Sequence, residues 1–143
     1  MLTGSMAMIY YAIPRMTRDI DIVIELSKFN MNNFIDEFTT DFYLSEHAIN
    51  DAVNKEFLFN LIHLESSFKI DFIIRKNTQY RIEEFANRKK ITINNFDLYI
   101  VSKEDLIISK LEWIRQYFSE LQIKDVNNLL HTDCDRNYLN RWI

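Results

Sequence analysis

Two aspartates, Asp19 and Asp21, stand two residues apart at the start of a run rich in Ile and Val. In a β-strand such residues leave the same face, with Cα atoms ~6.6 Å apart. Asp71 has similar surroundings, between Ile70 and Phe72 in a second strand-like run. If the two strands are neighbours, three carboxylates converge, and these hard oxygen ligands suit Mg²⁺ or Mn²⁺. Such a site is typical of phosphoryl transfer, in which metal ions activate the attacking oxygen and neutralise the leaving phosphate.

The only glycine and the only proline of the chain, Gly4 and Pro14, both precede this pair of aspartates. A glycine without Cβ lets phosphate oxygens approach backbone N–H groups closely, and the Ser5 hydroxyl adds a donor. The apolar stretch 6–12 predicts a short helix whose N-terminus favours phosphate. Pro14 is expected to end that helix and turn the chain toward the aspartate strand.

The elements that must position these residues are predicted from periodicity and capping signals. Alternation predicts strands at 20–26, 57–64 and 68–75, and a hairpin of 91–93 with 96–101 around Asn94-Asn95. Helices are expected at 31–39, from Ser45 to about Lys55, from the capping box of Ser102, after Ser119, and from about Asp135. A few strands followed by a run of helices favours an α+β fold.

Composition indicates one domain, residues 1–143, in which 102–143 form a helical C-terminal part. The net charge of −4 gives no indication of nucleic-acid binding, and the lone Cys134 cannot form an internal disulfide. No apolar run approaches the ~20 residues of a membrane span, so we expect a cytoplasmic protein with no membrane partner. The pattern at the chain ends predicts either that both ends are trimmed or that this is a minimal form.

The motif Gly-Ser, thirteen residues, then Asp-Ile-Asp, with the later Ile70-Asp71-Phe72, resembles the signature of polymerase-β-type nucleotidyltransferases. The segments PRMTRDIDIVIE, KIDFII and SKEDLIISKLEWIR…IKDVNNLL are similar to bacterial nucleotidyltransferases grouped with abortive-infection toxins of toxin–antitoxin systems. The resemblance extends from Gly4 to about Trp142.

This resemblance implies a small mixed β-sheet flanked by helices, with two Mg²⁺ on the three aspartates. Gly4 and Ser5 would hold the β- and γ-phosphates of a nucleoside triphosphate, and Lys110 would contact the triphosphate as a point charge. It also implies a family Lys and Asp on downstream helices, matched by Lys110 and Lys124-Asp125. Partners would be an NTP, an RNA or protein acceptor, and a cognate antitoxin or toxin.

Several of these residues have plainer interpretations. The aspartates could form a solvated strand face, and Lys110 could be a surface lysine with a buried stem. Arg15 and Thr17 are candidates for nucleotide binding, but Thr17 could instead hydrogen-bond the nearby backbone and Arg15 could be solvated. Asp125 could pair with Lys124 or cap a turn. The two tryptophans, Trp113 and Trp142, are expected to pack rather than to stack on bases.

The leading function is therefore a Mg²⁺-dependent transfer of a nucleoside monophosphate from an NTP to a hydroxyl on RNA, protein or a small molecule. The alternatives are a non-catalytic binding module or antitoxin-like partner with the same fold, and a phosphohydrolase that uses the same carboxylates.

Overall fold

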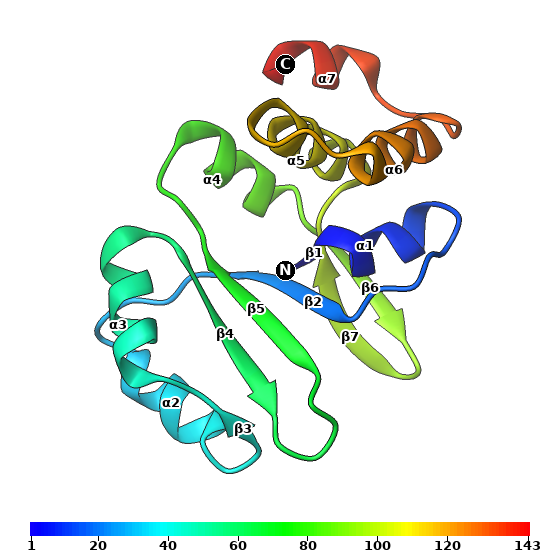
Figure 1. The fold of residues 1–143 in the computed structure, drawn as a ribbon. Coiled ribbons are helices and arrows are strands. Elements are labelled where there is room, and N and C mark those ends of the chain that lie inside the picture. The colour runs from blue at the N-terminus through cyan, green and yellow to red at the C-terminus, as the bar shows by residue number, and fades with distance from the viewer.

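The computed structural model describes all residues 1–143, and its centre is one mixed sheet of seven strands in the order β3-β4-β5-β2-β1-β7-β6 (Figure 1). The strands are β1 (Leu2–Thr3), β2 (Asp19–Ile24), β3 (Phe42–Tyr43), β4 (Leu58–His63), β5 (Lys69–Ile74), β6 (Lys89–Ile93) and β7 (Phe96–Ile100). The helices are α1 (Gly4–Tyr11), α2 (Met31–Phe38), α3 (Glu46–Lys55), α4 (Gln79–Ala86), α5 (Lys103–Gln116), α6 (Glu120–Leu130) and α7 (Arg136–Trp142).

The expected mixed sheet flanked by helices is confirmed. Strand β2 lies parallel to β5 on one side and antiparallel to β1 on the other. The two hairpins, β4–β5 and β6–β7, are antiparallel and lie on either side of this central group. The middle of the sheet is thus made of the strands that carry the predicted site residues.

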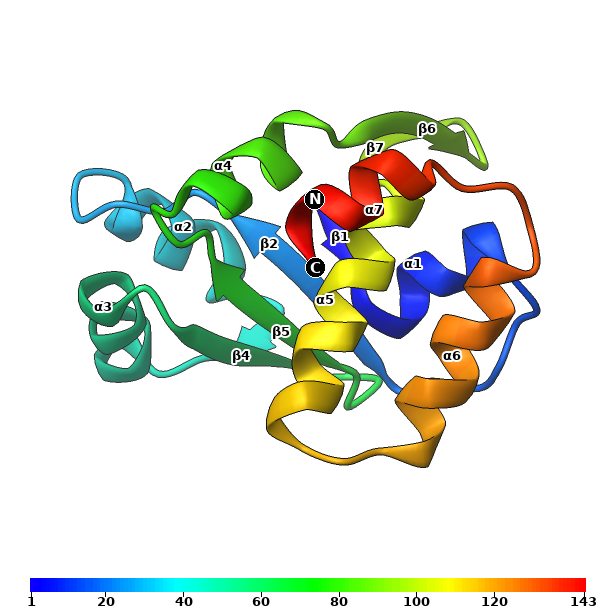
Figure 2. The ribbon, with the colours of Figure 1, turned by 90° about the horizontal axis from the view of Figure 1, so that it is seen from above.

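Two apolar cores hold the helices to the sheet. The ribbons show α2 and α3 beside β4, and α5, α6 and α7 grouped near α1 (Figures 1 and 2). One core packs α2 and α3 against β4 and β5, with Ile49 and Leu61 fully buried. The other joins α1 to the C-terminal helices α5, α6 and α7, with Ile107 and Leu129 fully buried. The chain folds back on itself, because the N-terminal helix α1 shares its core with the last three helices. None of these helices is both long and apolar enough to cross a bilayer.

Most expected boundaries are confirmed by the caps that the structure shows. The side chains of Ser45, Ser102, Ser119 and Asp135 each accept a backbone N–H at a helix start. Asn94 and Asn95 both have positive φ in the β6–β7 turn, as expected for this pair.

Three elements were not predicted from the sequence: α4, β1 and β3. Strands β1 and β3 have only two residues each, too few for an alternation signal. Helix α4 is capped by Thr78, but the side chain that it buries is the charged Glu84. A helix that buries a carboxylate lacks the apolar stripe by which periodicity identifies helices.

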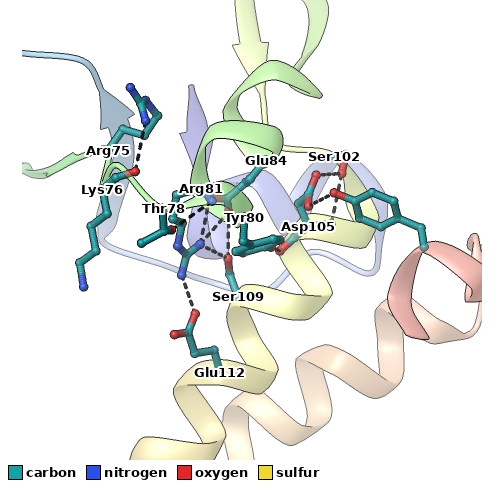
Figure 3. Close-up of polar contacts among 11 residues, drawn as sticks. Arg75, Lys76, Thr78, Tyr80, Arg81, Glu84, Ser102, Asp105, Ser109 and Glu112 are labelled. Atoms are coloured by element: carbon teal, nitrogen blue, oxygen red, sulfur yellow. Dashed lines mark hydrogen bonds and ion pairs between the residues drawn. The ribbon is translucent and has the colours of Figure 1, made fainter. Parts of the chain in front are cut away.

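The buried carboxylate of α4 is held in a polar cluster between α4 and α5, shown in Figure 3. Arg81 donates to Glu84 at 2.9 Å, to Ser109 at 2.9 Å and to Glu112 at 2.6 Å. Burial raises the pKa of Glu84 above its ordinary value, even though Arg81 and Ser109 act in the opposite direction. The cluster therefore fixes α4 against α5 by paired charges rather than by apolar packing.

We predict that Arg81→Met lowers the free energy of unfolding by about 1–3 kcal/mol, because Glu84 keeps its burial and loses its charged donor. The double variant Arg81→Met/Glu84→Leu should recover most of this loss, since no buried charge remains. Urea unfolding measures both, with Arg115→Met on the exposed face of α5 as the matched control, expected to change stability by less than about 0.5 kcal/mol. Equal losses in the single and double variants would contradict the explanation.

Candidate active site

Three carboxylates lie on one face in the middle of the sheet. Asp19 and Asp21 project from β2, and Asp71 is the direct register partner of Asp21 on the parallel strand β5. Burial, followed by the nearby charges of Asp71 and Asp19, raises the pKa of Asp21 above its ordinary value. The structure thus brings together the three predicted residues. Their carboxylates repel one another because the pairing of β2 with β5 places them side by side.

Gly4, at the first position of α1, lies directly against Asp21. Its φ is +63°, a conformation that L-residues with a side chain rarely adopt. A Cβ built on Gly4 would lie 1.9 Å from Asp21 Oδ2. Glycine is therefore required here both by backbone conformation and by space. The chain passes from β1 into α1 with its backbone against the acidic face, because Thr3 pairs with Asp21 across the sheet.

A lysine that the sequence reasoning did not single out lies among the carboxylates. Lys69 is the register partner of Asp19 and precedes Asp71 by two residues on the same face of β5. Its Nζ lies 3.0 Å from Asp71 Oδ2 and 3.7 Å from Asp19 Oδ1. The hydrogen bond to Asp71 is the main cause that raises the pKa of Lys69. The sequence contained a signal for this contact, because a lysine two residues before a strand aspartate shares its face of the sheet.

The carboxylate oxygens of Asp19, Asp21 and Asp71 are ligands that suit a divalent metal ion. In this structure the three side chains are not yet arranged to coordinate one. No group of three or more His, Cys, Asp or Glu side chains converges as a metal ion would require. However, Asp71 Oδ1 is buried and has no hydrogen-bond partner, so one ligand atom of this face is unsatisfied. Lys69 already supplies a positive charge to Asp19 and Asp71, the place where a cation is favoured.

The other predicted residues form a polar chain beside the acidic face, linking α1 to α5 and α6. Arg15 donates to Ser5 Oγ at 2.5 Å and to both carboxylate oxygens of Asp125 at 3.1 Å. Lys110 donates to Asp125 at 2.8 Å and to Gln122 at 2.9 Å. Burial by itself would raise the pKa of Asp125, but the hydrogen bonds from Arg15 and Lys110 outweigh it and lower that pKa.

These contacts decide between the interpretations that the sequence left open. Lys110 is only 5% exposed and is not a solvated surface lysine. Asp125 pairs with Arg15 and Lys110 rather than with Lys124. Thr17 Oγ1 lies 3.4 Å from the carbonyl oxygen of Asp19 and makes at most a weak local contact.

The two tryptophans differ in their surroundings. Trp142 packs against the core of the C-terminal helices, as expected. The expectation that Trp113 packs in the same way is wrong, because it is 53% exposed and its ring lies against that of Tyr117 near the end of α5. Trp113 lies in the last turn of α5, next to Tyr117 and Phe118, which are also exposed.

Similar folds occur among solved structures. A nucleotidyltransferase-like antigenic protein from Paracoccidioides brasiliensis has a TM-score of 0.57 and 17% identity over 91% of this chain and 66% of its own. The lincosamide antibiotic adenylyltransferase LnuA, solved with lincomycin bound, has a TM-score of 0.57 and 14% identity over 90% of this chain and 84% of its own. No family model matches the sequence, and no curated protein matches it. The chain thus has the nucleotidyltransferase fold.

We predict that Gly4→Ala lowers the free energy of unfolding by at least about 1–2 kcal/mol, the cost of a left-handed residue with a Cβ. The new Cβ also displaces the Asp21 carboxylate, so the loss should shrink in an Asp21→Ala background. Urea unfolding of the four proteins in this cycle measures the coupling. Strict additivity of the two changes would contradict the close contact between Gly4 and Asp21.

We predict that Asp21→Asn stabilises the metal-free protein near neutral pH by about 0.2–1 kcal/mol, the range for like charges on neighbouring strands. The raised pKa of Asp21 means that the folded state binds its proton more tightly than the unfolded state does. Wild-type stability should therefore fall as pH rises through the interval between the unfolded and the folded pKa. Melting temperatures across pH measure this, and the gain from Asp21→Asn should vanish below the unfolded pKa. A gain independent of pH would contradict the electrostatic cause.

Proposed function

We propose that the protein is a Mg²⁺-dependent nucleotidyltransferase that moves a nucleoside monophosphate from an NTP to a hydroxyl acceptor. The observation that carries this proposal is the contact between Gly4 and Asp21, which places the start of a helix against paired strand carboxylates. The nucleotidyltransferase fold of the chain supports it. In such a reaction an acceptor oxygen bonds to the α-phosphorus while the bond to the pyrophosphate oxygen breaks.

The residues divide this work according to their chemistry. Asp19, Asp21 and Asp71 would hold Mg²⁺ or Mn²⁺, which when bound polarises phosphate oxygens and offsets their charge. Backbone N–H groups at Gly4 and Ser5 would contact the β- and γ-phosphates at the N-terminus of α1.

The cations beside this helix start have a supporting role in the proposal. Arg15 donates to the Ser5 hydroxyl and Lys110 donates to Asp125, so both would act by holding the residues around the helix start in place. Thr17 would act only through the backbone of the loop before β2. The proposal therefore assigns phosphate contact first to Gly4 and Ser5.

The acceptor is proposed from the resemblance and from the neighbours. The likeness to abortive-infection nucleotidyltransferases favours an RNA or a protein hydroxyl, and a cognate antitoxin as partner in a toxin–antitoxin pair. The neighbour named as a lincosamide adenylyltransferase supports a small hydroxyl compound as a third class of acceptor. Cell extract, total RNA and a panel of small alcohols separate these classes when each is supplied with labelled NTP.

A second candidate is a non-catalytic module with the same fold. It is favoured by the lack of a finished metal centre and by the ion pairs that already engage Lys69, Lys110 and Arg15. Such a module would neither bind Mg²⁺ nor gain stability from NTP. A phosphohydrolase, the other alternative, would release phosphate without labelling an acceptor.

We predict that Asp19→Asn or Asp21→Asn abolishes most transfer of label from α-labelled NTP, because each removes a charged metal ligand while keeping the side-chain shape. The double variant should lose little more than either single variant, since the carboxylates act as a unit. The assay follows label on the acceptor and pyrophosphate release, with Asp97→Asn on β7 as a control of matched chemistry far along the sheet. Unchanged transfer in both single variants would overturn the proposed function.

A further inference from the structure

Lys69 is the one residue of the acidic face that the proposed function does not use. It is placed there by strand pairing, because its backbone is in register with Asp19 and its side chain shares a face with Asp71. The ammonium contacts one oxygen from each of these two aspartates. The position is thus fixed by the sheet and does not depend on a loop conformation.

The other cations near the face are committed elsewhere. Arg15 and Lys110 both pair with Asp125, which lies on α6. The ion pairs of Asp19 and Asp71 are made by Lys69 alone. Lys69 is therefore the side chain that directly offsets the negative charge of the carboxylates on this face.

A metal ion on this face would be coordinated by carboxylate oxygens with which Lys69 now forms ion pairs. Asp71 Oδ2 and Asp19 Oδ1 are its two partners, while Asp71 Oδ1 is buried without a partner. An ammonium and a divalent cation cannot share the same lone pairs at full strength. Lys69 is 40% exposed, on a flexible four-carbon stem, so it can leave the carboxylates without unfolding the strand.

We propose that Lys69 is a tethered counter-cation that a divalent metal ion displaces from Asp19 and Asp71 on binding. This inference rests on the proposed function, since it assumes that these carboxylates bind metal. Its consequence is that the free protein binds metal weakly, because the bare site already holds a positive charge. Metal loading then depends on the additional ligands that the phosphates of an NTP bring.

The first test measures Mn²⁺ binding without nucleotide by isothermal titration of the whole chain. We expect Lys69→Met to bind Mn²⁺ roughly two- to fivefold more tightly than wild type, because a competing ion pair is gone. Lys69→Arg keeps the charge and should stay near the wild-type affinity. The matched control is Lys90→Met, which removes another strand lysine paired with a single aspartate, Asp97, and should leave the affinity unchanged.

The second test follows the lysine itself. Under limited acetylation read by peptide mass spectrometry, modification of Lys69 should rise when Mn²⁺ is added, while that of Lys90 stays constant. Thermal melting without metal confirms that each variant is folded before its affinity is compared.

The outcomes separate this inference from the proposed function. If Mn²⁺ stabilises wild type, and Asp71→Asn abolishes that effect, but Lys69→Met binds no more tightly, the displacement is overturned and the metal site stands. If neither wild type nor Lys69→Met binds Mn²⁺, with or without added NTP, both are overturned. Tighter binding by Lys69→Met together with metal-dependent acetylation of Lys69 supports the displacement.

Discussion

The parallel pairing of β2 with β5 forces like charges together. Once Asp21 and Asp71 are register partners, their carboxylates share one face of the sheet, and Asp19 joins them two residues away. The surroundings follow from this constraint. Lys69 lies where it offsets part of the repulsion, and Gly4 leaves the room that the Asp21 carboxylate occupies. A sheet centre with only apolar residues would need neither feature.

The N-terminal helix and the C-terminal helices depend on each other around this face. Arg15 and Lys110 converge on Asp125, and Arg15 also reaches Ser5 at the start of α1. Below this polar chain, α1 shares an apolar core with α5, α6 and α7. Segments from both ends of the chain thus set the position of the Gly4-Ser5 turn relative to the aspartates. The site is a product of the closed fold and not of a single motif.

The structural neighbours share the fold of this chain. At 14–17% identity they share an arrangement of strands and helices with this chain, and a shared fold hosts many reactions. The chemistry of the site depends on the particular contacts of this molecule. In this molecule paired carboxylates lie against a glycine at a helix start, and Lys69 and Lys110 are ion-paired beside them.

The sequence by itself determined the local features. Alternation around Asp19 and Asp21 predicted their common face, the serine caps predicted helix starts, and the lone glycine and proline marked the turn into the site. These depend on neighbours along the chain, where spacing is fixed by covalent geometry.

Tertiary structure alone decided that β2 pairs with β5 in the register that joins Asp21 to Asp71, that Lys69 lies between carboxylates, and that Asp125 binds Arg15 and not Lys124. Helix α4 escaped prediction for the same reason, since Glu84 is stable in the interior only because Arg81 and Ser109 from two helices meet it there. Arg81 is only three residues from Glu84 on the same helix, but Ser109, Asp71 and Arg15 are distant in sequence from the residues that they meet, so no periodicity encodes those contacts.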